Sequence, residues 1–571
     1  GPAAALAEAK APPPWRRLAR RLARPGKMAW VAGFPAAAAL AIGQSITVRG
    51  AAPWTSPWFY LVIAALTVVF AQLAAAARRL VERPRRRPPP VWRNRRRAFW
   101  FDWAVIWLAW TPVWLSGWPG FWCYDAATAY RSAQAGAVTT AMPPIHTIAA
   151  TAVQDFVSSL TGSNNYGIAA WIAIQSLTVA AVFAHTLRRL RAWRVTRAVR
   201  WGGLAYFALF PTIALFSLNW ARNTLFSAVV LALAVNLVDA LKTPSRRRWL
   251  LTAVLAFAAI ALRRDAIYVF LLFTVLLLAT FRPARKALAI CFAGASLAGL
   301  LLDPLVYKGL LGLAEGDAAA TYSAPLQQLA RAYNQSPAAL TADQARRLEW
   351  YVKPEALAKY RPQLADPVIL GADGERIERD AKGFFGLWAE VGASHPGLYA
   401  DALAAATVQG WLPGAVIDAY SISSAGSLYP TTGTSYFCYS TEPPGVVAPK
   451  GPALVRQVYA AFSNQSRTVF EAPVLGWLWS PGTYAWLFAF SAALSWARGR
   501  RGRPSAFYPV ALVALASCAP IFLGPAMLTR YFLQLFYCLP LAAAFLADPR
   551  VFEFGATSPR PPGRGRRTSR P

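Results

Sequence analysis

The chain has 571 residues, of which 56% are hydrophobic, 13% aromatic and only 15% charged. A soluble chain carries about a quarter charged residues, so this composition excludes a soluble enzyme, a disordered protein and a coiled coil. The apolar residues fall in blocks of roughly twenty, the length that crosses a bilayer. The sequence therefore predicts an all-α polytopic membrane protein.

The apolar blocks predict about twelve transmembrane helices. Nine lie near 28–47, 57–77, 99–117, 166–186, 201–217, 223–241, 249–262, 265–281 and 286–303, and three near 474–496, 506–523 and 529–547. The predicted regions are a basic cytoplasmic N-terminus (1–27), an N-terminal transmembrane region (28–303), an extracytoplasmic domain (304–473), C-terminal transmembrane helices (474–547) and a basic, disordered tail (548–571).

Most of the 59 Lys and Arg residues lie in the N-terminus, in alternate connections between spans and in the C-terminal tail. Basic connections stay in the cytoplasm, so both termini are expected there. The net charge of +34 is therefore assigned to contact with anionic lipid, and no nucleic-acid partner is expected. Abundant Ala, Arg and Trp with few Lys and Met is typical of high-GC bacteria, which indicates a bacterial plasma membrane.

Two external segments are long, the loop 118–165 and the domain 304–473. Within the loop, 145–161 is apolar, but counting it as a span would move the following arginines outside, so an interfacial helix is expected. The domain is expected to be mainly helical, with a long loop at 421–450. Its predicted helices are Ala324–Gln335, a segment from the capping box at Thr341 to Tyr351, Gly383–Val391, Pro396–Thr407 and Ala453–Phe470.

The five cysteines are too few for a disulfide scaffold. Cys291, Cys518 and Cys538 lie inside predicted spans and are expected to be core residues. Cys123 and Cys438 are both predicted to be external, where they could form a disulfide or remain two free thiols.

Several charges lie where the orientation rule disfavours them. Arg222, Arg263, Arg264 and Arg530 lie in short external turns, at helix ends where a cation costs free energy unless it is paired or binds an anion. Asp125 follows the third span at the same expected depth. Arginine suits phosphate because its planar fork bonds two oxygens, so this pattern favours a lipid phosphate at the external boundary.

Each of these residues also has a structural interpretation. Asp125 could cap a helix that starts at Ala126. Arg263 and Arg264 could reach lipid headgroups, and Arg530 could pair with Asp303. His146, which follows Pro144 in the same loop, could only close the first turn of the interfacial helix.

The sequence lacks the motifs that bind several classes of cofactor. Three scattered histidines and no paired cysteines give no zinc pattern, and there is neither a P-loop nor a dinucleotide-binding fingerprint. No cofactor is therefore expected, and a reaction would have to draw on an activated substrate.

Four short stretches resemble the GT-C superfamily of polytopic membrane glycosyltransferases, in particular a little-characterised bacterial branch. They are Pro119-Gly120 with Tyr124-Asp125, Pro144-Ile145-His146, Arg222-Asn223-Thr224-Leu225-Phe226, and Arg263–Tyr268. The stretch GFFGLWAEVGASHPGLYADAL in the external domain is also similar. The likeness spans most of 99–547.

The resemblance implies a GT-C-like fold with an extracytoplasmic site and a lipid-linked sugar as donor. Asp125 matches the acid expected near the acceptor hydroxyl, and Tyr124, His146, Asp265 and Tyr268 are expected to bind substrate. Two positions depart from the pattern, since Arg222-Asn223 stands for Lys-Asp and Arg263-Arg264-Asp265 for an Arg–x–Asn motif. With one matching carboxylate, a divalent metal is left open and is not favoured.

The expected function is transfer of a sugar from a polyprenyl-phosphate donor to a cell-wall glycan, glycolipid or protein acceptor, with inversion. Asp125 would be the catalytic base, and Arg263, Arg264, Arg222 and Arg530 would hold the leaving donor phosphate. Besides these substrates, membrane lipids are the expected partners. The alternatives are O-antigen-ligase-like transfer from a lipid diphosphate, a non-enzymatic transporter of lipid-linked saccharide, and a structural or receptor role.

Overall fold

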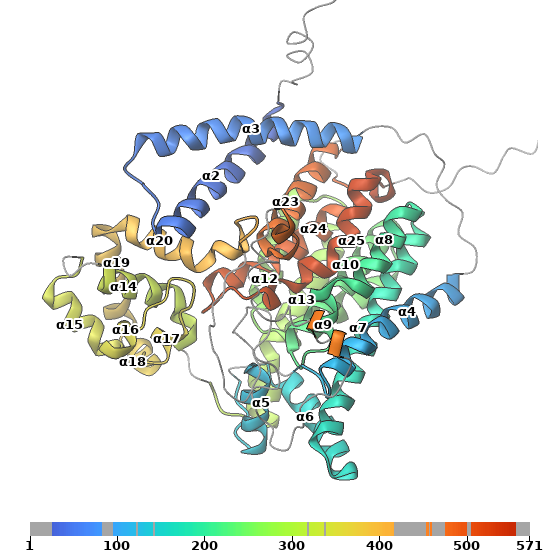
Figure 1. The fold of residues 1–571 in the computed structure, drawn as a ribbon, viewed down its shortest axis with the longest axis horizontal. Coiled ribbons are helices and arrows are strands. Elements are labelled where there is room, and N and C mark those ends of the chain that lie inside the picture. The colour runs from blue at the N-terminus through green and yellow to red at the C-terminus, as the bar shows by residue number, and fades with distance from the viewer. Residues whose placement is uncertain are drawn as a thin grey trace, which may run out of the picture.

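The structure is a computed structural model that describes residues 25–82, 95–121, 124–140, 143–316, 319–335, 339–415, 453–455, 457–458, 474–499 and 504–554. Over these ranges the chain consists of helices and turns, with isolated bridges between loops and no β-strand. Figure 1 shows a central helix bundle, with α5 and α6 at the bottom, a helical domain at the left, and the hairpin of α2 and α3 at the top.

Six helices in the described part of the chain are long and apolar enough to cross a membrane. They are α2 (Lys27–Arg49), α3 (Pro57–Glu82), α7 (Asn164–Ala192), α10 (Arg222–Lys242), α13 with the π-helical turn η1 (Arg285–Leu301, Leu302–Leu310), and η6 with α25 (Thr529–Phe532, Leu533–Ala547). A seventh span results if the bent pair α8 (Arg197–Leu209) and α9 (Pro211–Ser217) counts as one. The chain is thus an all-α protein with about six candidate spans, and the count of twelve stays a prediction.

The other predicted spans are helices that are shorter or less apolar. They are α4 (Arg95–Ser116), α11 (Arg246–Leu262), α12 (Ala266–Thr280), α23 (Pro481–Arg498) and α24 with η5 (Phe507–Ala516, Ala519–Leu523). With 17 and 15 residues, α11 and α12 fall short of the length that spans a bilayer without tilt or thinning. We call the end of the bundle that carries the 118–165 loop the external end, and the opposite end, where the arginine-rich connections lie, the basic end.

The centre of the bundle is α10, most of whose side chains are buried. It packs against α7, α11, α24 and α25. Small residues such as Ser227, Ala228 and Ala234 allow this close approach of helices, because membrane helices associate mainly through packing of small side chains. The external end of α10, which carries Arg222, therefore has a fixed position relative to four neighbouring helices.

The predicted span 201–217 is broken in the structure. The axes of α8 and α9 differ by 53°, with Phe210 between them. Pro211 starts α9, and the residue before a proline is disfavoured in the helical conformation, so Phe210 is extended at φ −68° and ψ 120°. The segment after α9, which contains Asn219 and leads to Arg222 at the start of α10, contacts the first external loop.

The first external loop contains two helices, α5 (Tyr124–Gln134) and α6 (Pro144–Thr161). A helix over 145–161 is thus confirmed, and its position relative to a bilayer stays a prediction. Its buried face is polar, with His146, Thr147, Thr151 and Gln154 turned inward. An apolar surface helix normally buries its apolar side, so this inverted face indicates a polar interior between α6 and the bundle.

The domain between α13 and α23 is helical in its described part and has a hydrophobic core of its own, built around Leu329, Leu348 and Phe384. Its helices are η2 (Ala319–Tyr322), α14 (Ser323–Gln335), α15 (Ala342–Tyr351), α16 (Pro354–Leu357), α17 (Asp366–Ile369), α18 (Gly374–Arg379), α19 (Ala381–Ser394), α20 (Pro396–Thr407) and η3 (Val408–Gly410). Four predicted helices are confirmed, and so is the capping box, in which Thr341 and Gln344 cap each other reciprocally.

Some sequence predictions lie outside the described residues. These are the loop 421–450, most of the helix Ala453–Phe470, and both Cys123 and Cys438. The prediction that Cys291, Cys518 and Cys538 are core residues is confirmed, since all three are buried. The short turns η4 (Leu475–Trp479) and η7 (Pro549–Phe552) flank the C-terminal helices.

Candidate functional site at the external end

The first external loop is joined to the turn before α10 by backbone hydrogen bonds. The Phe121 amide donates to the carbonyl of Leu218, and the Trp220 amide donates to the carbonyl of Phe121, each at 2.9 Å. Gly120 precedes this contact with φ +149°, and a Cβ there would lie 2.6 Å from Ile172 of α7. The Pro-Gly pair of the sequence thus allows the loop to lie directly on the bundle.

Arg263, which ends α11, is mostly buried and lies between three groups. Its guanidinium forms a 2.8 Å ion pair with Asp265 and donates to the carbonyl of Tyr531 at 3.4 Å. Its guanidinium carbon lies 5.2 Å from the ring centroid of Phe226, on the external half of α10. Arg263 therefore connects the turn after α11 with α10 and with the turn before α25.

Arg530 lies in that last turn and is buried. It donates to the Tyr531 hydroxyl at 3.2 Å, and its guanidinium carbon lies 5.1 Å from the Tyr531 ring centroid. The guanidinium carbon of Arg263 lies 6.0 Å from the same centroid. Two of the predicted phosphate-binding arginines, separated by most of the C-terminal half of the chain, thus meet at one tyrosine.

We call the external end of the bundle where Arg222, Arg263, Arg264 and Arg530 lie the arginine rim. Arg264 has other partners on this rim than Arg263 and Arg530 have. Its guanidinium forms a 2.6 Å ion pair with Asp303 of η1 and donates to the carbonyl of Thr140 at 3.4 Å. A pairing of Asp303 with Arg530 was one structural interpretation of the sequence; in the structure Asp303 pairs with Arg264 instead. Because the Arg264 side chain is 54% exposed, this ion pair contributes little to stability.

Arg222 is the first residue of α10, where the amides at the helix N-terminus favour an anion. Among the described residues, no carboxylate lies within ion-pair distance of its guanidinium. Its charge acts on His146 of α6, which packs edge-on against Trp220 and Trp171, with centroid distances of 4.8 and 5.5 Å. Burial, and then Arg222, lower the pKa of His146 to about 3, so the imidazole is neutral at physiological pH.

Buried polar atoms around His146 have no hydrogen-bond partner in the described part of the chain. They are His146 Nε2, both amide atoms of Gln154, Trp171 Nε1, both amide atoms of Asn219, and Asn223 Nδ2. Buried polar groups nearly always have partners, and water or a ligand supplies those that the protein lacks. Water or a ligand could therefore supply the partners that these atoms of α6, α7 and the start of α10 lack among the described residues.

Asp125 lies in the first turn of α5, which begins at Tyr124, so it follows the cap position rather than occupying it. The side chains of Asp125 and Tyr124 lie outside the described part of the structure. Their neighbour Ala126 is fully buried in the core of the bundle, which fixes the start of α5 against it. Tyr268 of α12 is 70% exposed, and no described contact connects it with the arginines.

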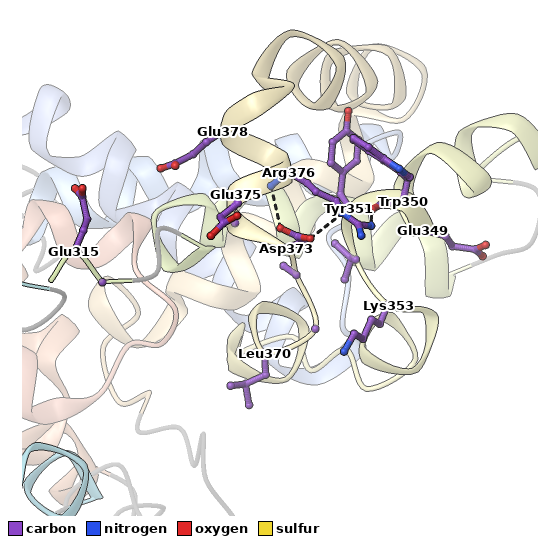
Figure 2. Close-up of a pocket in the computed structure, with 15 residues that line it drawn as sticks. Glu315, Glu349, Trp350, Tyr351, Lys353, Leu370, Asp373, Glu375, Arg376 and Glu378 are labelled. Carbon is purple, nitrogen blue, oxygen red and sulfur yellow. Dashed lines mark hydrogen bonds and ion pairs between the residues drawn. The ribbon is translucent and has the colours of Figure 1, made fainter. Parts of the chain in front are cut away.

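An open hollow of about 900 Å³ lies on the domain between α13 and α23 (Figure 2). Its rim carries five carboxylates, Glu315, Glu349, Asp373, Glu375 and Glu378, against two cations, Lys353 and Arg376. Several of these charges are paired locally, as in the 2.8 Å contact of Arg376 with Asp373 drawn in Figure 2. The hollow thus has an excess of negative charge, with the exposed Trp350 at its edge.

The hollow is connected to the arginine rim through the backbone. The Thr140 amide donates to the carbonyl of Ala314 at 3.0 Å, and Ala314 directly precedes Glu315. The carbonyl of Thr140 in turn accepts from Arg264. On the other side, Gln409 of η3 donates to the Thr529 hydroxyl at 2.9 Å, next to Arg530. The domain is therefore attached on two sides, to the loop before α6 and to the turn before α25, where the Ala365 amide also donates to the Pro525 carbonyl at 2.7 Å.

A family model matches residues 133–548, the greater part of the chain. The chain belongs to DUF6020, a family of unknown function. The region that matches DUF6020 contains His146 and all four rim arginines, and it begins after Asp125. No curated protein and no solved structure matches the chain.

Sequence reasoning missed the amides of this DUF6020 chain. Gln154, Asn219 and Asn223 are uncharged, so they do not break the orientation rule that singled out the arginines. The sequence does contain a weaker signal for them, since Asn219 and Asn223 lie within three residues of Arg222, and Gln154 lies on the same helix as His146. Tyr531 was also missed, because an aromatic residue at a membrane boundary is ordinary. In the described residues no group of three or more His, Cys, Asp or Glu side chains is placed to hold a metal ion.

Proposed function

We propose that this chain is a GT-C-type membrane glycosyltransferase with about twelve spans, which transfers a sugar from a polyprenyl-phosphate donor to an extracytoplasmic acceptor. One observation carries the proposal. Arg263 and Arg530, from two turns far apart in the sequence, meet at Tyr531, and Arg263 also lies over Phe226, one helical turn from Arg222 on α10. Buried polar atoms of α6, α7 and the start of α10 have no hydrogen-bond partner among the described residues. Such a cationic and polar rim next to lipid suits a lipid phosphate that carries a polar sugar.

The arginines differ in how freely they can bind phosphate. Arg263 and Arg264 each have a carboxylate partner, so phosphate would have to displace or share it. Arg222 has none in the described chain and stands at a helix N-terminus, which adds amide donors for the same anion. We therefore assign the leaving phosphate first to Arg222, with Arg263 and Arg530 closing the other side.

In the proposed reaction the acceptor oxygen attacks the anomeric carbon, and the bond from that carbon to the phosphate oxygen breaks. The electron pair of the broken bond goes to the phosphate, where Arg222 and the α10 amides stabilise the charge. The acceptor proton passes to the carboxylate of Asp125 as the new bond forms. A single displacement of this kind inverts the anomeric configuration.

The hollow on the external domain is the proposed acceptor surface. Its excess of carboxylates favours a neutral or cationic acceptor and disfavours an anionic one. Trp350 is half exposed, with the Arg376 guanidinium carbon 5.5 Å from its ring centroid, and the exposed part of the ring offers an apolar surface on which a sugar ring can pack. These features suit a neutral or amino-sugar glycan, which leaves donor and acceptor on two sides of the rim.

A second candidate, transfer from a lipid diphosphate, is favoured by one spacing. Arg222 and Phe226 are one helical turn apart on α10, and Arg263 lies over Phe226. Residues at this spacing are neighbours on the helix surface. Two guanidinium groups so placed could hold two adjoining phosphates. The donor that is turned over, monophosphate or diphosphate, separates the two candidates.

The decisive experiment uses the full chain in lipid nanodiscs with polyprenyl monophosphate- and diphosphate-linked sugars. Asp125→Asn is expected to lower kcat by roughly 100-fold or more, because a general base supplies about that factor. Asp155→Asn is the matched control, since Asp155 lies in the same loop, where its carboxylate accepts from Gln134 at 3.0 Å. Equal turnover of Asp125→Asn and wild type would remove the assignment of the base.

A further inference from the structure

The two ends of the α2–α3 hairpin are attached to the protein in different ways. At the external end, Asp401 of α20 accepts from the Ala52 amide and from Trp54 Nε1, at 3.0 and 2.9 Å. Arg331 of α14 lies 3.6 Å from Asp401 and donates to the Gly50 carbonyl at 2.7 Å. Asp401 and Arg331 are nearly fully buried, so this end of the hairpin is held firmly.

At the basic end a groove of about 260 Å³ separates the hairpin from α23. Its walls are mainly alanines of all three helices, together with Phe490 and Leu494. Because alanine side chains are short, they do not fill the space between the hairpin and α23. The groove is smaller than the ~300–1,000 Å³ of sites that enclose whole small molecules, but its mainly apolar walls suit part of an acyl chain.

The mouth of the groove is positively charged. Arg78 and Arg79 line it, and Glu82 is the one acid among its lining residues. Glu82 lies 3.0 Å from Arg78 and 3.8 Å from Arg498 of α23, so it is shared between two cations. An apolar groove between membrane helices with a cationic mouth matches an anionic lipid, whose phosphate would meet the arginines.

The N-terminal segment 1–24 of the chain is a poorer occupant. It contains Arg16, Arg17, Arg20, Arg21 and Arg24, which repel the cations at the mouth. A zwitterionic lipid would fill the apolar part equally well but gain less at the arginines. Charge complementarity therefore selects one occupant.

We propose that the groove binds an anionic phospholipid of the leaflet at the basic end, with an acyl chain between the hairpin and α23 and the phosphate at Arg78 and Arg79. The lipid would complete the contact of the hairpin with the bundle, which at the external end is made by protein alone. This proposal is independent of glycosyl transfer.

Native mass spectrometry of the full chain, extracted from bilayers with equal amounts of palmitoyl-oleoyl phosphatidylglycerol and phosphatidylcholine, tests the headgroup. Wild type is expected to retain phosphatidylglycerol in preference. The double variant Arg78→Gln/Arg79→Gln should bind it roughly 20–30-fold more weakly, given the contribution of each cation near a membrane surface. The control Arg246→Gln/Arg247→Gln removes two exposed arginines of α11 at the same end and should retain it. Equal loss in both variants would mean general attraction to basic loops and would overturn the site.

A second pair of variants tests the groove itself. Ala75→Leu fills it without changing a charge, whereas Ala76→Leu adds the same side chain on the exposed side of α3. Loss of bound phosphatidylglycerol in Ala75→Leu alone is the expected result. Full retention by Ala75→Leu, or by all variants, would show that no acyl chain lies in the groove.

Discussion

The two ends of the helix bundle both bury arginine, but they neutralise it differently. At the basic end, Asp102 of α4 is fully buried and forms ion pairs with Arg191 and Arg200, the first at 3.0 Å. At the external end, Arg222 has no carboxylate partner among the described residues, and His146 Nε2 and several nearby side-chain amide atoms have no hydrogen-bond partner there.

This difference indicates that the arginines at the basic end stabilise the structure, whereas Arg222 at the external end can bind a ligand. A buried carboxylate that pairs with two arginines from two other helices is a structural cluster, and its role is to hold α4, α7 and α8 together. A cation at a helix N-terminus beside unpartnered polar atoms is complete only when an anion or water arrives. Four substitutions test this contrast, and they are ordered from the largest expected effect to the smallest.

Substituting Asp102→Ala should give the largest effect, on stability alone. It leaves Arg191 and Arg200 buried without their carboxylate, which costs about 3–5 kcal/mol for a broken buried pair. Thermal unfolding in detergent would show the loss, while the remaining folded protein should keep its turnover. A stable Asp102→Ala protein with impaired turnover would mean that the basic end takes part in function, and the contrast would fail.

Substituting Arg222→Gln should give the opposite pattern. Loss of one donor to the leaving phosphate lowers kcat by roughly 100–1,000-fold, equivalent to about 2.7–4 kcal/mol in the transition state. Stability should hardly change, because no described carboxylate loses a partner. Arg49→Gln, at the exposed external end of α2, is the control in the same assay. Unfolding of Arg222→Gln at a temperature well below wild type would make Arg222 a structural cation like Arg200.

The arginines of the external end also show which features could be predicted from the sequence alone. Local patterns of hydropathy and charge predict the helix positions, the capping box at Thr341 and the place of Arg222 at the start of an apolar helix. The pairing of Arg264 with Asp303, and the meeting of Arg263 and Arg530 at Tyr531, depend on how distant helices pack. The bend at Phe210 was also missed, although Pro211 gives a local signal for it, because an uninterrupted apolar run outweighed a single proline.

The buried imidazole of His146 gives an effect of intermediate size that depends on pH. Its pKa falls from 6.5 to about 3 on folding, so the unfolded state binds more protons between these values. Stability therefore rises with pH over this window and is lost on acidification below about 6.5. Between pH 7 and 5 the loss amounts to about 2 kcal/mol. Denaturant unfolding of His146→Gln should lack this part of the pH dependence, and an unchanged pH dependence would show that the imidazole is hydrated or paired when folded.

The smallest effect is expected for Asp265→Asn. The direction in which this substitution changes the donor KM distinguishes two roles of Asp265. If Asp265 serves to hold Arg263 away from the phosphate, Asp265→Asn releases the Arg263 guanidinium and should lower the donor KM. A change of a few fold is expected, because a partly exposed ion pair contributes about 1 kcal/mol or less. If Asp265 binds the substrate directly, as the sequence resemblance implies, the same change should raise KM. The control Asp303→Asn releases Arg264 in the same way, but that side chain is half exposed, so a smaller shift is expected. A lower KM for Asp265→Asn alone would place Arg263 with Arg222 on the phosphate, and a higher one would leave Arg222 as its main ligand.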